Sequence, residues 1–589
     1  MASTLVLGLD LGNTTCSVAV YRAGVVEVVA NPEGSRVTPA CIAFTEVETL
    51  LGEPARAQLA RNVANTVVDG LRLLGREYDD DDFQKELASW RFKVSKGKDG
   101  APLVEVKLKG EAKSFTAPRL LALLLSKLRA DADASTGETV KEAVVAVPAA
   151  FSEQQTAALK EAAQTGAIRV KLMLSAPLCV ALLFGQTIGR EATATAAAAA
   201  AAAASTPPPP PPPPQQLLVV DIGGSSSFAA VVERAVVLPT VADAEATPAA
   251  AEGSLAARTA TDEYTVRACV LERGLGGNAV DVKLRAHVCK EIRRRQRVDL
   301  SDNSRAMSRL LAACQTAKHS LTLSAQATIA VEADGADYFA NVSRAALEEL
   351  TVSTATGAAA LAARALAASG LAPSKVDALL LSGGGARMPR VQAALSALCP
   401  DVPMHFSATS EESTVRGAAH AGAMLRPLTA TDAPSEQRTA ALSGRARLPR
   451  ALGLVTAAGH VAKLAEAHAA VPLTRAARLA PPAPSALPIL LQLVELPPPA
   501  ASALSAVAAE GTEAAAAAAA PEVSAADCRI VASLAVRELP DGVVSLLVRV
   551  SLDTERHLEL ICEAALGGDA EEGEGGGSLR TVSLASVKA

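Results

Sequence analysis

The chain has 589 residues, with 56 Lys and Arg against 62 Asp and Glu, so its formal net charge is −6. This mildly acidic balance, with only 2% aromatic residues, excludes a nucleic-acid footprint over the whole chain. Nine cysteines without a C-x-x-C pair indicate reduced thiols and no disulfide framework or zinc site. We find no run of 18 apolar residues and no cleavable signal, and we therefore expect a cytosolic protein without a membrane span.

Strand-like and helix-like segments alternate over the first three quarters of the chain. The segments predicted as strands and their turns are 5–21, 142–151, 216–224 and 375–385, and those predicted as helices are 117–130, 153–165 and 304–323. Strands interleaved with helices predict an α/β architecture.

Low-complexity tracts interrupt this pattern. Nine alanines (196–204) and eight prolines (207–214) predict an insertion at about 190–216, and the proline run favours a polyproline II rod. A second insertion is expected at 239–262.

The last part of the chain has a different character. The polar region 427–449 is predicted to be a linker. After it, residues 450–589 contain short strand-like runs with no long helical pattern, and an alanine-rich tract covers 500–526. We therefore expect a small β domain there.

Two glycine turns about 210 residues apart suggest a shared ligand. Asp10 and Asp221 each end a predicted strand and open a turn. The residues that follow are Gly12, Asn13, Thr14 and Thr15 in the first turn, and Gly223, Gly224 and Ser225 in the second. Glycine lets backbone N–H groups approach phosphate, hydroxyls donate hydrogen bonds, and aspartate can hold Mg²⁺ through water.

A single such turn indicates only a tight hairpin. A third glycine turn, formed by Gly383, Gly384 and Gly385 after another strand, makes a coincidence improbable, and we expect it to open a helix whose N-terminus faces a nucleotide. Together the turns predict a polyphosphate site with Asp10 and Asp221 on its metal side.

Motifs in a fixed order carry a resemblance to the seventy-kilodalton heat-shock chaperone family. They lie at residues 7–20, 31–44, 65–80, 143–155, 221–227, 275–281 and 382–389. The resemblance implies an actin-like two-lobed ATPase domain over residues 1–426. It also implies a truncated, β-rich remnant of the peptide-binding domain at 450–589, without a helical lid.

The resemblance further implies binding of ATP or ADP with Mg²⁺. In this family the turn containing Gly276 and Gly277 also faces the nucleotide. The adenosine-contacting helix corresponds to Gln315, Lys318, His319 and Thr322, and Arg387 corresponds to the arginine that stacks on adenine.

Several positions that serve catalysis in the family are changed. Leu71 stands where a lysine aligns with the γ-phosphate, and Ala176 replaces a glutamate near the metal. Phe228 replaces a further aspartate, while Thr156 replaces an arginine of the relay that starts at Pro148. We therefore expect nucleotide binding with impaired hydrolysis, at most a weak ATPase.

With these features the chain resembles one type of family member, the subunit of a ribosome-associated complex. Such a subunit pairs with a zuotin-type J-domain protein and assists a second seventy-kilodalton chaperone at the nascent chain. The alternatives are an ATP-cycling chaperone, a nucleotide-exchange-type partner and, least favoured, an actin-fold sugar kinase; neither DNA nor a membrane is expected as a partner. A basic run at 290–297 fits either RNA contact or a solvated helix end.

Overall fold

We examined the chain in a computed structural model. The structure describes residues 5–87, 90–149, 151–187, 213–237, 261–407 and 409–425, together with the backbone of eight strands between 452 and 588. These residues belong to two compact units, Met1–Gly444 and Arg445–Ala589. The core of each predicted insertion and all of the predicted linker lie outside the described residues.

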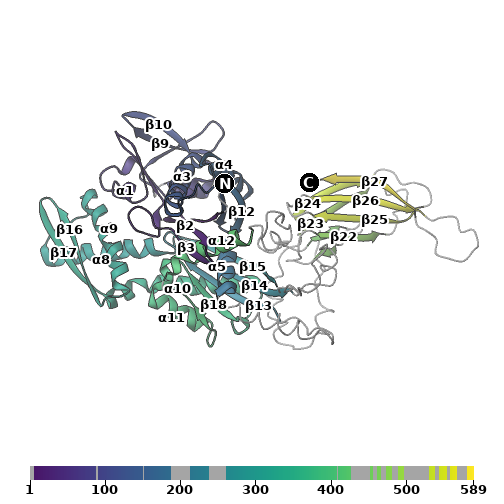
Figure 1. The fold of residues 1–589 in the computed structure, drawn as a ribbon. Helices are drawn as coiled ribbons and strands as arrows, with labels where there is room; N and C mark the ends of the chain where they lie inside the picture. The colour runs from purple at the N-terminus through teal and green to yellow at the C-terminus, as the bar shows by residue number, and fades with distance from the viewer. Residues whose placement is uncertain are drawn as a thin grey trace, which may run out of the picture. The chain divides into compact units, whose positions relative to one another are not determined.

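A six-stranded sheet forms the base of the first lobe of unit 1 (Figure 1). Its order is β12-β11-β1-β2-β3, and β4 pairs with β2. Its strands are β1 (Val6–Leu11), β2 (Thr15–Arg22), β3 (Val25–Val28), β4 (Thr38–Pro39), β11 (Glu142–Val147) and β12 (Arg169–Ser175). Because β1, β11 and β12 run parallel, their carboxyl ends meet at one edge.

Smaller elements complete the first lobe. Two three-stranded sheets contain β5 (Cys41–Phe44), β6 (Thr49–Leu51), β7 (Thr66–Val68), β8 (Lys93–Lys96), β9 (Pro102–Leu108) and β10 (Glu111–Thr116). The helices are α1 (Glu53–Arg56), η1 (Val63–Asn65), η2 (Gly70–Leu73), α2 (Asp81–Leu87), α3 (Ala117–Thr136) and α4 (Glu153–Thr165). Helices α3 and α4 confirm two of the predicted helical runs.

The second lobe contains a five-stranded sheet of order β15-β14-β13-β18-β19. Its strands are β13 (Gln215–Ile222), β14 (Ser226–Val237), β15 (Thr261–Arg273), β18 (Ala378–Ser382) and β19 (Met404–His405). Its other elements are α8 (Gly277–Gln296), α9 (Ser304–Leu321), β16 (Gln326–Ala333), β17 (Ala336–Ser343), α10 (Arg344–Ser369), η3 (Pro373–Lys375), η4 (Gly384–Arg387), α11 (Pro389–Leu398) and η5 (Ser410–Glu412). Helix α9 confirms the third predicted helical run.

Two helices lie between the two sheets and join the lobes. Helices α5 (Ala176–Thr187) and α12 (Ser413–Met424) approach so closely that a Cβ at Gly417 would overlap the Cys179 carbonyl. Buried side chains from β1, β13 and α12, such as Val6, Leu217 and Ala418, share one hydrophobic cluster there. This packing brings the ends of β1 and β13 into the same region of the molecule.

Helix α10 is long and apolar enough to cross a membrane by length and composition alone. In this structure its buried residues, among them Leu347, Ala358 and Leu366, belong to the hydrophobic core of the second lobe. A core helix of a globular domain has the same length and composition, so α10 is explained by its packing.

Unit 2 is built from strands in all of its described residues. One four-stranded sheet has the order β21-β20-β23-β24 and the other β22-β25-β26-β27. The strands are β20 (Leu452–Val455), β21 (Val461–Ala465), β22 (Leu473–Leu479), β23 (Ile489–Glu495), β24 (Arg529–Val536), β25 (Val543–Leu552), β26 (Leu558–Leu566) and β27 (Arg580–Lys588). This agrees with the β-rich character expected from the sequence.

Candidate functional site

The two predicted glycine turns form hairpins of the same geometry. The Gly12 N–H donates to the Thr15 carbonyl over 3.0 Å, and the Gly223 N–H donates to the Ser226 carbonyl over 3.1 Å. A Cβ at Gly12 would lie 2.5 Å from the Thr15 oxygen, and one at Gly223 would lie 2.6 Å from that of Ser226. Both turns therefore require glycine.

The hairpins face one another although 213 residues separate the contacting side chains. The Asn13 Nδ2 donates to the Ser226 Oγ over 3.5 Å. A Cβ at Gly224 would overlap the Thr14 side chain. The structure thus brings together the two turns that the sequence analysis assigned to one ligand.

Two carboxyl groups lie at the base of the hairpins. Burial, and secondarily the charge of Asp221, raises the pKa of Asp10 to about 7. Burial also raises the pKa of Asp221 to about 6, although a hydrogen bond from Ser382 opposes this rise. Two acids that disfavour each other's charge are a suitable place for a divalent cation.

Such a cation would need oxygen ligands beyond these two carboxylates. Among the described residues no group of three or more His, Cys, Asp or Glu could hold a metal ion. Water or phosphate oxygens complete such a coordination shell, which is the usual arrangement for Mg²⁺.

Buried hydroxyl groups around the hairpins have no hydrogen-bond partner within the protein. These are the Oγ1 of Thr14 and the Oγ atoms of Ser175 and Ser225. Buried polar atoms are normally satisfied, so unpaired hydroxyls beside glycine turns fit a ligand rich in acceptor oxygens. The donors and the carboxyl pair together fit a phosphate group with Mg²⁺.

The third glycine turn packs against the second hairpin. Gly383 has φ of 79°, and its N–H donates to the Ser410 carbonyl over 3.1 Å. A Cβ on Gly383 would lie 2.5 Å from the Ile222 oxygen, whereas one on Gly384 would meet no atom within 4 Å. The turn was expected to open a helix; in the structure it leads first into the 3₁₀ turn η4, and α11 begins at Pro389.

Helix α8 begins at the second hairpin. Gly276 precedes its first residue, the Gly277 N–H donates to the Gly223 carbonyl over 2.9 Å, and the Asn278 N–H donates to the Gly224 carbonyl over 2.8 Å. These bonds fix the turn Gly223–Gly224 to the helix. A Cβ at Gly276 would lie 2.5 Å from the Gly224 oxygen.

Lys318 is buried and holds α9 against α8. Its Nζ donates to the Gly277 carbonyl over 3.1 Å and lies 2.8 Å from the Asp281 Oδ1. Burial raises the pKa of Asp281, and the ammonium of Lys318 opposes that rise. The lysine therefore has a protein partner beside the site, and its contact with a nucleotide stays a prediction.

The remaining residues that were predicted to contact adenosine lie at the end of α9 and on η4. The Thr322 hydroxyl donates to the His319 carbonyl over 2.7 Å, and Gln315 lies one turn before His319. Burial and the cations of Lys318, Arg387 and Arg56 lower the pKa of His319, which places it near these groups. Arg387 forms a 2.6 Å ion pair with Glu411, which orients its guanidinium.

The four substituted positions are uncharged. Leu71 lies on η2 and packs against the hydrophobic core of the first lobe. Ala176 is the first residue of α5, directly after Ser175, and Phe228 pairs in register with Asp221 on the neighbouring strand. Thr156 lies in the first turn of α4, where its N–H donates to the Ser152 carbonyl. None of these four side chains carries a charge.

Two serines that the structure places near the site were not among the predicted site residues. Ser382 pairs in register with Asp221. Ser175 is the last residue of β12, at the edge of the sheet where β1 also ends. The position of each serine was the signal available in the sequence. Each is the last residue of a strand, and both strands run parallel to a strand that carries an aspartate.

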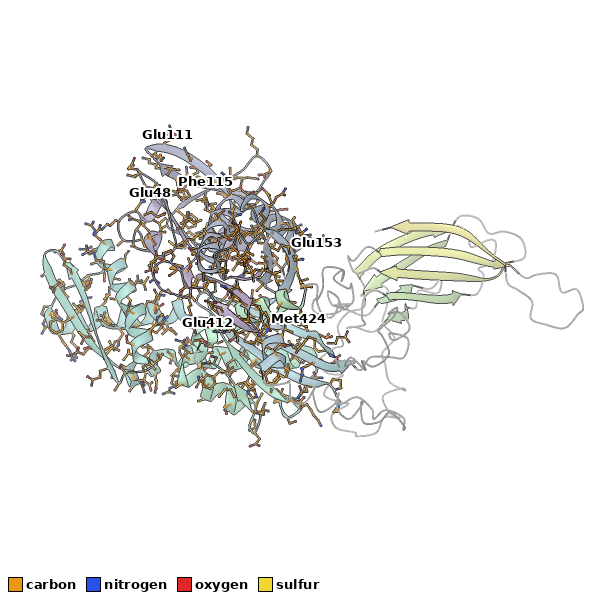
Figure 2. The ribbon with its side chains drawn as sticks, viewed as in Figure 1. Glu48, Glu111, Phe115, Glu153, Glu412 and Met424 are labelled. Atoms are coloured by element: carbon orange, nitrogen blue, oxygen red, sulfur yellow. The ribbon has the colours of Figure 1, made fainter. Side chains whose placement is uncertain are left out.

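Two ion pairs between the lobes were also missed. Arg273 at the end of β15 donates to Glu86 of α2 over 2.9 Å, and Glu86 also pairs with Arg72 over 2.9 Å. Arg36 pairs with the buried Glu412 over 3.4 Å, and Glu412 is labelled in Figure 2. Sequence separation hides such pairs, because the partners are 187 and 376 positions apart in the chain.

Comparison with known proteins agrees with these features. The family model described as Hsp70 protein matches residues 6–235 and 258–479. The "Heat shock 70 kDa protein" of Neurospora crassa is 30% identical over 471 residues, which cover 79% of this chain and 64% of that relative. A "Ribosome-associated molecular chaperone" of Saccharomyces cerevisiae is 30% identical over 428 residues, covering 72% of this chain and 62% of that relative.

The chain thus matches less than two thirds of the length of these relatives. The matching family model nevertheless spans both lobes, including both hairpins and the third glycine turn, and continues into unit 2. The chain therefore belongs to the Hsp70 family.

Proposed function

We propose that this protein binds ATP or ADP with Mg²⁺ but hydrolyses ATP poorly, and that it acts as a co-chaperone subunit with a J-domain protein at the ribosome. One observation carries the proposal: the three glycine turns meet with unpaired hydroxyls, while Leu71, Ala176 and Phe228 bring no charge to them. Binding and catalysis are thus supported by different sets of residues.

Support for nucleotide binding comes from backbone geometry. Members of the family bind ATP and ADP, typically with Mg²⁺. In this chain Asp10 and Asp221 would hold the ion through its water shell, and Thr14 and Ser225 would donate to phosphate oxygens. The bound ion would supply charge neutralisation for the phosphates.

Support for impaired hydrolysis comes from side-chain chemistry. Phosphoryl transfer depends on positioning and on charges aimed at the transition state. Removing one such contact costs on the order of 10²–10³ in rate in well-studied enzymes. Leu71, Ala176 and Phe228 replace three charged groups, so the residues that remain bind the phosphates without aligning an attacking water.

Support for the ribosomal role comes from the relatives. Two of the similar yeast proteins are named as ribosome-associated molecular chaperones. A chain that does not cycle would assist another chaperone by staying bound to its partner, and Thr156 leaves no arginine for the family's relay between domains. On this proposal the protein works in the cytosol, next to a J-domain protein and a second seventy-kilodalton chaperone.

The first test separates binding from turnover. We expect MgADP and MgATP to raise the melting temperature, since a ligand that binds only the folded state stabilises it by mass action. We expect single-turnover assays with excess protein to release almost no phosphate. An ordinary family rate of release would overturn the hydrolysis part of the proposal, and the absence of any thermal shift would overturn the binding part.

The second test concerns partners. We expect the tagged chain to sediment with ribosomes and to co-purify with a J-domain protein in fixed stoichiometry, whether ATP, ADP or no nucleotide is added. A chain that is monomeric in lysate and absent from ribosomes contradicts the co-chaperone role without affecting the binding proposal.

The alternative function is that of an ATP-hydrolysing folding chaperone. The retained Asp10 and Asp221 favour it, because they are the metal-side carboxylates of the site. The single-turnover assay decides between the two functions.

A further inference from the structure

The last turns of α8 carry a cluster of exposed cations, which we call the basic tip. It consists of Lys290, Arg293, Arg294, Arg295 and Arg297. The side chains of Arg293, Arg294 and Arg295 are 72%, 64% and 57% exposed. Helices α8 and α9 and the hairpin β16–β17 project from the rest of unit 1, so this cluster lies at the end of a protruding subdomain (Figure 1).

Neighbouring acids neutralise the basic tip only in part. Arg294 and Arg295 both pair with Glu291, and Arg293 pairs with Asp299. Lys290 and Arg297 have no ion-pair partner among the described residues. Exposed ion pairs of this kind are weak, so a polyanion can compete with them.

The excess positive charge of the protruding subdomain is concentrated in the basic tip. Residues 277–343 contain ten Lys and Arg against seven Asp and Glu, in a chain whose net charge is −6. The acids include Glu332, which pairs with Arg309, and Asp334, which accepts from Asn303. The protein therefore concentrates positive charge on one protruding part.

The helix end alone does not account for this cluster. Cations are favourable near a helix C-terminus, but that effect falls off within the last turn. Lys290 lies nearly two turns before Gln296, where α8 ends, and Arg297 follows the helix with φ of 60°. Positions 290, 293 and 294 fall on one face of α8 at helical spacing, and Arg297 follows directly after the helix end.

An exposed aromatic residue lies on the strand that contacts the end of α8. The Gln296 Nε2 donates to the Phe339 carbonyl over 2.6 Å, which fixes β17 against the end of α8. Phe339 is 56% exposed, although a ring of this size is usually buried. Arginine clusters that track phosphates and aromatic rings that stack on bases are the two components of single-stranded RNA sites.

We propose that the basic tip and Phe339 bind a single-stranded RNA segment. The arginines contact phosphates, and the Phe339 ring stacks on an unpaired base. That this RNA is ribosomal rests on the proposed function. The binding of RNA itself is argued from the charge and the exposed ring alone. This surface is separate from the nucleotide site, since Lys318 contacts Asp281 at the opposite end of α8.

The test uses the full chain and a fluorescein-labelled RNA of about 20 nucleotides, followed by anisotropy over a range of KCl concentrations. The logarithm of the binding constant should fall linearly with that of the salt concentration, by about 0.7 for each phosphate contact. We expect Arg293→Gln/Arg294→Gln/Arg297→Gln to weaken binding about 10- to 100-fold and to lower the salt slope by about 2. Phe339→Ser should weaken binding about fivefold or more without changing the slope.

The matched control removes three exposed lysines from the first lobe, as Lys85→Gln/Lys107→Gln/Lys113→Gln. It changes the net charge equally and should leave both quantities close to those of the unchanged chain. Equal losses from both triple variants would mean non-specific attraction and would overturn the proposal, as would unchanged binding in the Arg variant. Melting curves with MgADP confirm that each variant is folded.

Ribosome sedimentation separates this inference from the proposed function. Loss of ribosome binding in the Arg variant, with RNA binding lost in parallel, supports both. If the unchanged chain sediments with ribosomes but does not bind RNA, the RNA site is refuted while the ribosomal role stands. If the Arg variant then loses the ribosome, the basic tip binds an acidic protein surface instead.

Discussion

The hairpins β1–β2 and β13–β14 share one turn geometry but differ in what surrounds their carboxyl groups. Asp221 lies opposite Ser382 and is hydrogen-bonded to it, whereas the strand neighbour of Asp10 in β11 is Ala146. The thiols of Cys16 and Cys179 lie near enough to Asp10 for its charge to raise their pKa values. The Asp10 pKa is the higher, about 7 against about 6 for Asp221, because the charge of Asp221 raises the pKa of Asp10 while the Ser382 hydrogen bond lowers that of Asp221.

Nucleotide binding and phosphoryl transfer depend on different features of such a site. The turns are fixed by glycines and backbone hydrogen bonds, which tolerate changes in the surrounding side chains. The charges needed for phosphoryl transfer come from individual side chains. Two of the positions where such a charge is replaced, Leu71 and Ala176, belong to the Asp10 side of the site. A site can therefore lose catalysis while its binding frame stays complete.

Restoring the lost charges is the strongest test of this asymmetry. We expect Leu71→Lys/Ala176→Glu/Phe228→Asp to raise single-turnover hydrolysis by about 10²-fold or more, because each preorganised charge can contribute on that order. Leu71→Lys alone should gain less than about tenfold, since the water and metal stay poorly positioned. Phosphate release under excess protein measures both.

The restored variant also carries a stability cost that serves as its control. Leu71 packs against the first-lobe core and Phe228 against the cluster between the sheets, so charged side chains there lower the free energy of unfolding. A variant that melts cooperatively, binds ATP and stays inert would place the defect elsewhere. A family-like rate from Leu71→Lys alone would show that the other two positions are dispensable.

The second prediction concerns the glycine hairpins instead of the substituted catalytic positions. Gly224→Val should weaken MgADP binding by about 100-fold, because its Cβ would overlap Thr14 and push the hairpins apart. Calorimetric titration measures this loss. Gly70→Ala is the control, since its Cβ would meet nothing closer than the Val67 Cγ1 at 3.7 Å. Similar losses from both changes would contradict the role assigned to the facing hairpins.

The sequence predicted the frame better than the contacts. The turns around Gly12 and Gly223 could be recognised because glycine next to a strand end has few alternatives. The partners of Lys318 and Arg387 could not, since Asp281 and Glu411 lie 37 and 24 residues away and meet them only after packing. The helix expected to follow the third glycine turn begins only at Pro389, because η4 makes the turn first.

The third prediction uses pH to compare the two carboxyl groups. Because both pKa values lie above the ordinary 3.8, the folded chain binds more protons than the unfolded chain between about pH 4 and pH 7. The stability that these groups contribute is present at low pH and is lost as the pH rises through about 6 to 7. The nucleotide-free chain should thus melt several degrees lower at pH 8 than at pH 5.

A divalent cation should reverse that trend, because it favours the ionised carboxylates. Thermal melts with and without MgADP measure the effect, and Asp10→Asn should reduce the slope more than Asp221→Asn, since Asp10 has the larger shift. Equal slopes in the unchanged chain and in both variants would mean that these groups do not titrate as described.

The smallest expected effect concerns the connection between the lobes rather than the hairpins. Arg273 ends β15 and precedes the turn at Gly276, while Glu86 belongs to α2, so their ion pair ties the Asp221 side to the Asp10 side. The Arg273 side chain is 50% exposed, and such pairs contribute only about 0.2–1 kcal/mol.

We expect Arg273→Gln to speed release of labelled ADP about two- to fivefold at low salt, and less at high salt because the pair is screened. Lys85→Gln, an exposed change on the same helix as Glu86, should leave release unchanged. A release rate in Arg273→Gln equal to that of the unchanged chain at low salt would show that the hairpins alone hold the lobes around the nucleotide.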